Sequence, residues 1–582
     1  MKRVLSILIV SAFFMGVSVQ CAPAVHPSPV LPPYGLFVHY GLYSLAGGVW
    51  NGKQIPYYAE QIMNHARITP SDYEKLAQQF TAEKFNADSI VQLAQDAGMQ
   101  YVLFTAKHHD GFCLFNSPSS KGYNSVEATP SHRDLVKELA EACARRQMKL
   151  GLYYSLPDWH YPYSRPIERP ANDTTTNCTQ FVNQVYSPLE LISDSLENYI
   201  VAQLQELLTQ YGPICTLWFD MGLPTPVQSE RFRATVKALQ PDCLVGGRVG
   251  NGCGDYLTLP DNAQVAGGLW DDAFSLSMAG KAVVAPSFMW DSPASLYGTW
   301  GYRSWQERIP VAQQVKRQLA RFMQTRSHGG TFVLNIGPAG DGSILPYENE
   351  ILTAMGSWVK AHNAATLGAR PTPFSQLPAG ISCTHLPNAD LNGGTLYLTV
   401  FDNYPIERLF ITATHLKSLL IRNGLRNTIT LADVPTSAKT PYVARFEYAD
   451  TLCVKQPGTS PLADSSLVLT QANGHALSAF DTRLYNSCEP NAKWLWYLYG
   501  VPEGDYAATI AYTPEATSQT YRLGSLTTLL PGVDRMHQTF YAGILHLTPD
   551  ADGNAALFLE PVSEDPLQPL NLKDITIYLT LL

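Results

Sequence analysis

The chain has 582 residues, of which 45% are hydrophobic and 15% are charged, and its formal net charge is −9 at pH 7. This length leaves room for about three domains, and the apolar share is sufficient for a large buried core. The acidic balance excludes a protein that tracks phosphate groups, so we expect no nucleic-acid partner. The 31 tyrosines and 10 tryptophans suit stacking on sugars, but they suit any β-rich protein equally well.

The amino-terminal stretch has the pattern of a secretory signal. Lys2 and Arg3 precede an apolar run that begins at Val4, and small residues lead to Cys21. We expect residues 1–21 to be a signal peptide, which is too short to remain as a transmembrane segment of the mature chain. Cys21 stands where a bacterial lipoprotein carries its lipid. The expected product is secreted across the inner membrane and is periplasmic or lipid-anchored through Cys21, with a soluble secreted protein as the alternative.

Between residues 33 and 372, short apolar runs alternate with helical patterns. Repeated β-then-α units predict a parallel sheet, and their number favours a closed (β/α)8-like TIM barrel over an open sheet. No Gly-rich nucleotide-binding motif follows the first strand. The expected strands include 34–41, 101–112, 148–160, 214–222, 243–250, 283–291 and 329–338.

After residue 372 the pattern changes to short alternating segments separated by turn residues, which is typical of β-sandwiches. We therefore expect an α/β protein in which the catalytic barrel is followed by two all-β sandwich domains. The expected boundaries are 33–372 for the barrel, 373–456 for the first sandwich and 466–582 for a carbohydrate-binding-like second sandwich.

Polar side chains stand where the expected barrel strands end, and active sites of such barrels are assembled at that edge. Because side chains alternate along a strand, Trp218 should point into the barrel mouth together with Asp220, while Leu217 and Phe219 face the helices. One strand-end histidine by itself is most often structural, but several polar residues that converge on one mouth indicate a site. The converging residues are His39, His108, His109, Tyr154, Asp220 and Arg248.

The chemistry of this set suits a sugar. Imidazoles, phenols, an indole and an arginine supply donors, acceptors and a flat apolar wall, and one deep carboxylate can act as a nucleophile. The adjacent His108 and His109 raise the question of a metal, but neighbouring side chains on a strand diverge, and no Asp, Glu or Cys set has ligand spacing. We expect neither a metal nor a cofactor.

Several segments also resemble a known family. YGLFVHYGLYS, YVLFTAKHHDGFCLF, LGLYYSLPDWH, TLWFDMG, WGY and GGTFVLNIGPAGDGSI are similar, in order and spacing, to the motifs of the α-L-fucosidases of glycoside hydrolase family 29. The resemblance implies a retaining exo-glycosidase with Asp220 as its nucleophile. It also implies that the terminal sugar is held by residues at the matching positions, which are His39, His108, His109, Tyr154, Trp218 and Arg248.

The chain departs from the family pattern at the general acid/base. Family members carry a Glu on the loop after the Arg strand and another Glu in a later WE motif, whereas here the corresponding segments offer Asp261 and Asp291. Both aspartates are therefore acid/base candidates, although a retaining mechanism needs two carboxyl groups about 5 to 5.5 Å apart and Asp is shorter than Glu. Glu60 lies near a Glu-Trp position that lines the family pocket, and Gln61 replaces the Trp.

These observations leave three functions open. The first is an exo-glycosidase that releases terminal L-fucose from glycans through a glycosyl-Asp220 intermediate. Fucose and galactose share a hydroxyl arrangement in mirror series, so a β-galactosidase-type or relaxed glycosidase with the same pocket is the second. The third is a catalytically impaired carbohydrate-binding protein. The expected partner is accordingly a fucosylated or galactosylated oligosaccharide.

Overall fold

The computed structural model describes most of the barrel region and parts of the β-rich region. The described residues are 29–160, 192–263, 289–372, 381–389, 393–401, 430–433, 441–448, 459–479, 489–514, 518–532, 536–549, 553, 555–563, 570 and 572–582. The predicted signal peptide with Cys21 lies outside these residues.

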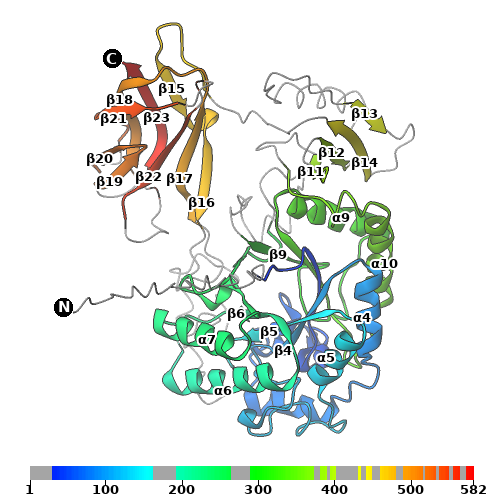
Figure 1. Cartoon of the computed structure of the whole chain (residues 1–582). Coiled ribbons are helices and arrows are strands. Elements are labelled where there is room, and N and C mark those ends of the chain that lie inside the picture. Colours follow the sequence, from blue (N-terminus) through cyan, green and yellow to red (C-terminus); the bar gives the residue numbers. More distant parts are fainter. Residues whose placement is uncertain are drawn as a thin grey trace, which may run out of the picture.

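Eight parallel strands form the centre of the barrel (Figure 1). Their spatial order is β7-β6-β5-β4-β1-β10-β9-β8, and a parallel bridge between Gly246, just after β7, and Tyr256, just before β8, joins the two ends of this series. The strands are β1 (Tyr34–Val38), β4 (Tyr101–Lys107), β5 (Lys149–Ser155), β6 (Ile214–Asp220), β7 (Leu244–Val245), β8 (Leu257–Thr258), β9 (Trp290–Ser295) and β10 (Thr331–Ile336). The predicted (β/α)8-like barrel is therefore confirmed.

Amphipathic helices cover the outside of the strands (Figure 1). In α4, residues three and four apart, such as Ala87, Ile90, Val91 and Ala94, are buried, and the Asn86 side chain caps the first turn. The long helices are α4 (Ala87–Asp96), α5 (Leu135–Arg145), α6 (Asp194–Gln210), α7 (Pro226–Leu239), α9 (Val311–Ser327) and α10 (Pro346–Ala361). In the described part of the chain, no helix has the length and apolarity that crossing a bilayer requires.

Short elements occupy the loops at the rim of the barrel. They are α1 (Leu42–Ala46), β2 (Val49–Trp50), β3 (Lys53–Gln54), α2 (Ile62–His65), α3 (Pro70–Tyr73) and the 3₁₀ turns η1 (Ala59–Gln61), η2 (Glu74–Gln79), η3 (Pro118–Ser120) and η5 (Gly247–Val249). Two of these turns, η1 and η5, carry residues of the site described below.

Where the structure describes the carboxyl-terminal part, its regular elements are strands and one short turn, as the alternating pattern indicates. One antiparallel sheet has the order β11-β12-β14-β13, and its first strand is bridged to the end of the barrel region through Arg370 and His385. Its strands are β11 (Ile381–Pro387), β12 (Gly394–Val400), β13 (Thr430–Asp433) and β14 (Tyr442–Tyr448). Residues 402–429 lie outside the described residues.

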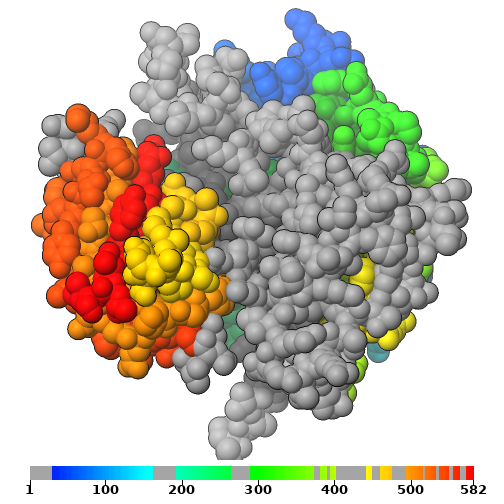
Figure 2. Space-filling model, turned by 90° about the horizontal axis from the view of Figure 1, so that it is seen from above, coloured from blue at the N-terminus to red at the C-terminus, as the bar shows by residue number. Residues whose placement is uncertain are grey.

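The last part of the chain forms a two-sheet sandwich, which is the rounded yellow-to-red body in Figure 2. Trp496 and Leu559 from one sheet pack with Ile510 and Ile577 from the other in a single core. The sheets are β15 (Leu467–Thr470), β23 (Leu572–Leu581), β18 (Gly504–Pro514) and β21 (Gln538–Leu547), and β16 (His475–Ala479), β17 (Glu489–Leu498), β22 (Ala555–Pro561), β19 (Gln519–Leu523) and β20 (Leu526–Leu530). The 3₁₀ turn η6 (Gln471–Asn473) precedes β16. The expected boundaries at 372, 456 and 466 stay predictions.

Candidate active site

The side chains of β6 alternate between the inside and the outside of the barrel. Trp218 belongs to the cluster inside the barrel, whereas Leu217 and Phe219 belong to the larger core that includes the helices. Asp220, two residues after Trp218, lies on the inner side at the end of the strand. The strand ends there because Met221 and Gly222 both adopt left-handed backbone angles, with φ of 57° and 79°.

Asp220 is the centre of the polar cluster at the mouth. Its Oδ2 accepts a hydrogen bond from the Tyr153 hydroxyl at 2.7 Å, and its Oδ1 accepts one from Arg248 Nη1 at 2.9 Å. His109 Nε2 lies 3.7 Å from Oδ2. The residue is only 6% exposed, so these contacts offset the cost of removing its charge from water.

Arg248 connects two carboxylates. Its Nη2 donates to Asp261 Oδ1 at 2.5 Å, and its guanidinium lies over the Trp218 ring at 4.5 Å. The turn η5 that carries it packs tightly on β8, because a Cβ at Gly247 would lie 2.5 Å from the Tyr256 carbonyl oxygen. The glycine before Arg248 is thus needed to place the guanidinium between Asp220 and Asp261.

The two acid/base candidates occupy different places. Asp261 is at the mouth, where its Oδ2 also accepts a hydrogen bond from the Trp300 indole at 3.2 Å. Burial raises the pKa of its carboxyl, and the nearby Asp220 charge acts in the same direction against the opposing effect of Arg248. A raised pKa is what a proton donor needs.

Asp291 lies deeper than expected. The sequence pattern predicts a strand that ends at Asp291, but β9 runs from Trp290 to Ser295, so this expectation was wrong and Asp291 is near the start of the strand. It pairs in register with Thr331, the first residue of β10, and accepts a hydrogen bond from the Trp218 indole at 2.8 Å. Burial raises its pKa to about 6. Asp291 therefore supports Trp218 from below, and only Asp261 shares Arg248 with Asp220.

The three predicted histidines come together at the mouth. Neighbouring His108 and His109 were expected to diverge as on a strand, but β4 ends at Lys107 and their ring centroids are only 4.1 Å apart. His108 stacks on Tyr153 with centroids 5.3 Å apart, and its Nδ1 has no hydrogen-bond partner among the described residues. Burial lowers the pKa of His39 and of His109 to about 3, so both rings are neutral.

Glu60 holds a segment of the mouth in place. Its Oε2 accepts hydrogen bonds from the Thr299 hydroxyl and from the backbone N–H groups of Trp300 and Gly301, at 2.8 to 3.0 Å. Its other oxygen is buried and has no partner among the described residues. Burial raises the pKa of Glu60 to about 7. The residue predicted to line the pocket thus fixes the Trp300 segment.

Tyr154 does not face the mouth, which corrects the prediction for this residue. Its hydroxyl donates to Gln203 of α6 at 2.6 Å, and Lys107 Nζ lies 4.5 Å from the centre of its ring, so it faces the helices. Tyr153 takes its place, because Tyr153 pairs in register with Trp218 and Tyr154 pairs with Phe219. The period of two puts the two tyrosines on opposite sides of β5, and the register with β6 decides which of them faces the mouth.

Two further residues of the site, Trp300 and Asn335, were not singled out from the sequence as site residues. The Trp300 ring lies 5.3 Å from the His39 ring, while its indole N–H binds Asp261. Asn335 donates to the Trp300 carbonyl at 2.7 Å and contacts His39 Nδ1 at 2.6 Å. Only the WGY and LNIGP motifs that contain these residues pointed to them.

The cluster can bind a polyol and attack it. It combines aromatic rings, neutral imidazoles, two buried polar atoms that have no partner among the described residues, and a carboxylate that shares one guanidinium with a second carboxyl group. No group of three or more His, Cys, Asp or Glu side chains among the described residues could hold a metal ion.

Comparison with known proteins agrees with this arrangement. The family model described as alpha-L-fucosidase matches residues 33–364, which is more than half of the chain. Tissue alpha-L-fucosidase of Bos taurus is 30% identical over 356 residues, which cover 58% of this chain and 68% of that protein. Plasma alpha-L-fucosidase of Homo sapiens is 28% identical over 354 residues, which cover 57% of this chain and 67% of that protein.

Solved structures are also similar. An alpha-L-fucosidase from Lactobacillus casei in complex with its α-L-fucose product is 30% identical, with a TM-score of 0.47 over 57% of this chain and 97% of that chain. An alpha-L-fucosidase from Bacteroides thetaiotaomicron is 22% identical, with a TM-score of 0.55 over 72% of this chain and 93% of that chain, which supports the fold. On the match of the family model across its barrel, the chain belongs to the α-L-fucosidase family, glycoside hydrolase family 29.

Proposed function

We propose that this chain hydrolyses terminal α-L-fucosides of fucosylated oligosaccharides with retention of configuration, through a covalent ester between the sugar and Asp220. The observation that carries the proposal is the placement of Asp220 at the end of β6, where Tyr153 and Arg248 each donate to one of its two oxygens. A protein that only binds sugars has no need of a buried carboxylate at this position.

In the first step, an oxygen of Asp220 forms a bond to the anomeric carbon while the bond from that carbon to the leaving oxygen breaks. Asp261 gives its proton to the leaving oxygen and becomes a carboxylate. In the second step, Asp261 takes a proton from water, and the resulting hydroxide oxygen replaces Asp220 at the anomeric carbon. Arg248 contacts both carboxyl groups, so it stabilises whichever one carries the charge.

The sugar itself would be held by the neutral rings around the nucleophile. His39, His108 and His109 and the free oxygen of Glu60 offer polar atoms to several hydroxyls, while Trp218 and Trp300 supply flat apolar surface. Because these groups surround Asp220 closely, we propose an exo-acting enzyme that takes the terminal residue of a chain.

The test compares three substrates in the wild-type protein and in Asp220→Asn. We expect the wild type to hydrolyse 4-nitrophenyl α-L-fucoside and a fucosylated oligosaccharide, but not 4-nitrophenyl β-D-galactoside. Asp220→Asn should lose turnover on both fucosides while its affinity for L-fucose stays within about tenfold. Retained turnover in this variant would defeat the assignment of the nucleophile. Galactosidase activity would favour the relaxed pocket, and fucose binding without hydrolysis would favour a binding protein.

We also propose that the chain is exported and is periplasmic or anchored through a lipid on Cys21. The support is the run of basic, apolar and small residues ahead of Cys21. Fractionation of cells that express either the wild type or Cys21→Ala tests the anchor. If Cys21 carries a lipid, the wild type should be found in the membrane fraction and Cys21→Ala in the soluble fraction.

A further inference from the structure

For two histidines of the mouth, the hydrogen-bond partners of the ring determine which of its nitrogens carries the hydrogen. His39 Nδ1 lies 2.6 Å from Asn335 Oδ1, and the amide nitrogen of Asn335 donates to the Trp300 carbonyl oxygen at 2.7 Å. A carbonyl oxygen cannot donate, so the amide group that faces Trp300 must be the NH2 and the one that faces His39 must be the oxygen. His39 Nδ1 is therefore the donor and carries a hydrogen.

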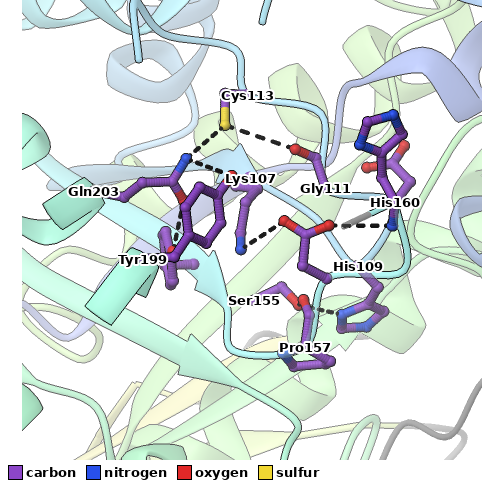
Figure 3. A network of polar contacts seen from close by, with 12 residues as sticks. Lys107, His109, Gly111, Cys113, Ser155, Pro157, His160, Tyr199 and Gln203 are labelled. Carbon is purple, nitrogen blue, oxygen red and sulfur yellow. Dashed lines mark hydrogen bonds and ion pairs between the residues drawn. The ribbon is translucent and has the colours of Figure 1, made fainter. Parts of the chain in front are cut away.

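The same reasoning applies to His109 with different groups (Figure 3). Its Nδ1 lies 2.7 Å from Ser155 Oγ, and Ser155 Oγ lies 2.7 Å from the Pro157 carbonyl oxygen. Ser155 has one hydroxyl hydrogen, and in its contact with the Pro157 carbonyl oxygen the hydroxyl is the only group that can donate. The serine oxygen must then accept from the ring, so His109 Nδ1 also carries a hydrogen.

A neutral imidazole has only one N–H, so the far nitrogen of each ring is a bare acceptor. Both rings are buried, which disfavours the doubly protonated form. Buried Lys107, paired with Asp158 at 3.4 Å, and Arg248 further disfavour a positive charge on His109. His109 Nε2 lies 3.7 Å from Asp220 Oδ2, which is too long for a hydrogen bond. This separation fits two acceptor atoms with no hydrogen between them.

We propose that Asn335 and Ser155 are positioning residues that fix the tautomers of His39 and His109, so that both Nε2 atoms accept hydrogen bonds from substrate hydroxyls. The pocket then selects ligands that donate at two positions. The identity of the sugar in this inference rests on the proposed function. His108 is the internal contrast, because its Nδ1 has no partner among the described residues to fix its tautomer.

The first measurement needs no turnover. In protein labelled with ¹⁵N-histidine, the nitrogen that bears the hydrogen and the bare nitrogen have well-separated resonances, and His39→Gln and His109→Gln assign the two rings. We expect hydrogen on Nδ1 in both. Ser155→Ala should release His109 to a mixture of tautomers and leave His39 unchanged, whereas Ser155→Thr, which keeps the hydroxyl, should preserve the wild-type spectrum. Hydrogen on Nε2 of either ring in the wild type would overturn the inference.

The second measurement uses unmodified protein and sugar analogues. L-fucose is compared with its deoxy and deoxyfluoro analogues at each hydroxyl, as competitive ligands, because fluorine accepts weakly but cannot donate. At two positions the deoxyfluoro sugar should lose about tenfold in affinity, as much as the deoxy sugar loses. Deoxyfluoro sugars that bind within twofold of fucose at every position would refute the inference. If none of the sugars bound, the proposed function would fail, while the imidazole spectra would still decide the tautomers.

Discussion

Replacement of Asp261 by Asn separates the acid/base candidates most sharply. The amide has the same shape as the carboxyl group and its oxygen can still accept from Arg248, although its NH2 then faces the Trp300 indole; it cannot give a proton to a leaving oxygen. Loss of general-acid help slows departure of a sugar alkoxide by about 10² to 10⁴-fold, which is about 3 to 5 kcal/mol of barrier. A 4-nitrophenolate leaves without a proton, so its departure should slow by less than about tenfold.

The assay is kcat/KM for 4-nitrophenyl α-L-fucoside and for a fucosylated oligosaccharide, because this quantity reports the step in which the leaving group departs. Added azide should restore turnover of the nitrophenyl substrate by Asp261→Asn and give a fucosyl azide of retained configuration, since azide attacks the Asp220 ester without needing a general base. Asp291→Asn is the matched control. Because Asp291 lies beneath Trp218, its replacement should lower kcat/KM for both substrates by the same factor.

Two results would refute this reasoning. Equal losses on both substrates in Asp261→Asn would mean that the variant acts by disturbing Arg248 and Asp220, not by removing an acid. A loss in Asp291→Asn that is confined to the oligosaccharide would make the deeper aspartate the acid.

The other predictions concern neighbouring tyrosines and a buried glutamate. Tyr153→Phe removes a donor to the Asp220 carboxylate and should lower kcat/KM by about 10 to 100-fold. Tyr154→Phe should leave kcat/KM unchanged and lower the free energy of unfolding, measured by chemical denaturation, by about 1 kcal/mol. The opposite pattern would reverse the assignment of the two rings. Burial raises the pKa of Glu348 to about 8 from its ordinary 4.5, so the folded state holds this proton more tightly and loses stability as pH rises from about 4.5 to about 8. Glu348→Gln stays neutral, so its Tm relative to wild type should rise by several degrees between pH 5 and pH 8.5, and a difference that does not vary with pH would contradict the raised pKa.

Periodic features of this protein follow from the sequence alone. The alternation of apolar runs with helical patterns predicts the parallel barrel, and the period of two along β6 puts Trp218 and Asp220 on the inner side. The same period puts the neighbouring Tyr153 and Tyr154 on opposite sides of β5, although the register with β6 is needed to show that Tyr153 is the inner one. These inferences succeed because backbone geometry repeats along a strand whatever the surrounding structure is.

Other features depended on where segments distant in the chain meet. Only the folded barrel shows that β9 begins at Trp290, so that Asp291 lies deep, and that the loop after β8 brings Asp261 to Arg248. The convergence of His108 and His109 also belongs to the tertiary structure, because the strand period stops at Lys107.

The contacts that orient His39 and His109 also join segments that are distant in the chain. Asn335 reaches His39 across 296 positions of the chain, and Ser155 reaches His109 across 46. No local periodicity encodes such pairs, since they arise when parallel strands far apart in sequence end at one rim and their loops pack against each other. The sequence by itself therefore determined the barrel and the position of Asp220 at its rim. The packing at the mouth decided which acid, which tyrosine and which ring nitrogens face the sugar in the proposed reaction.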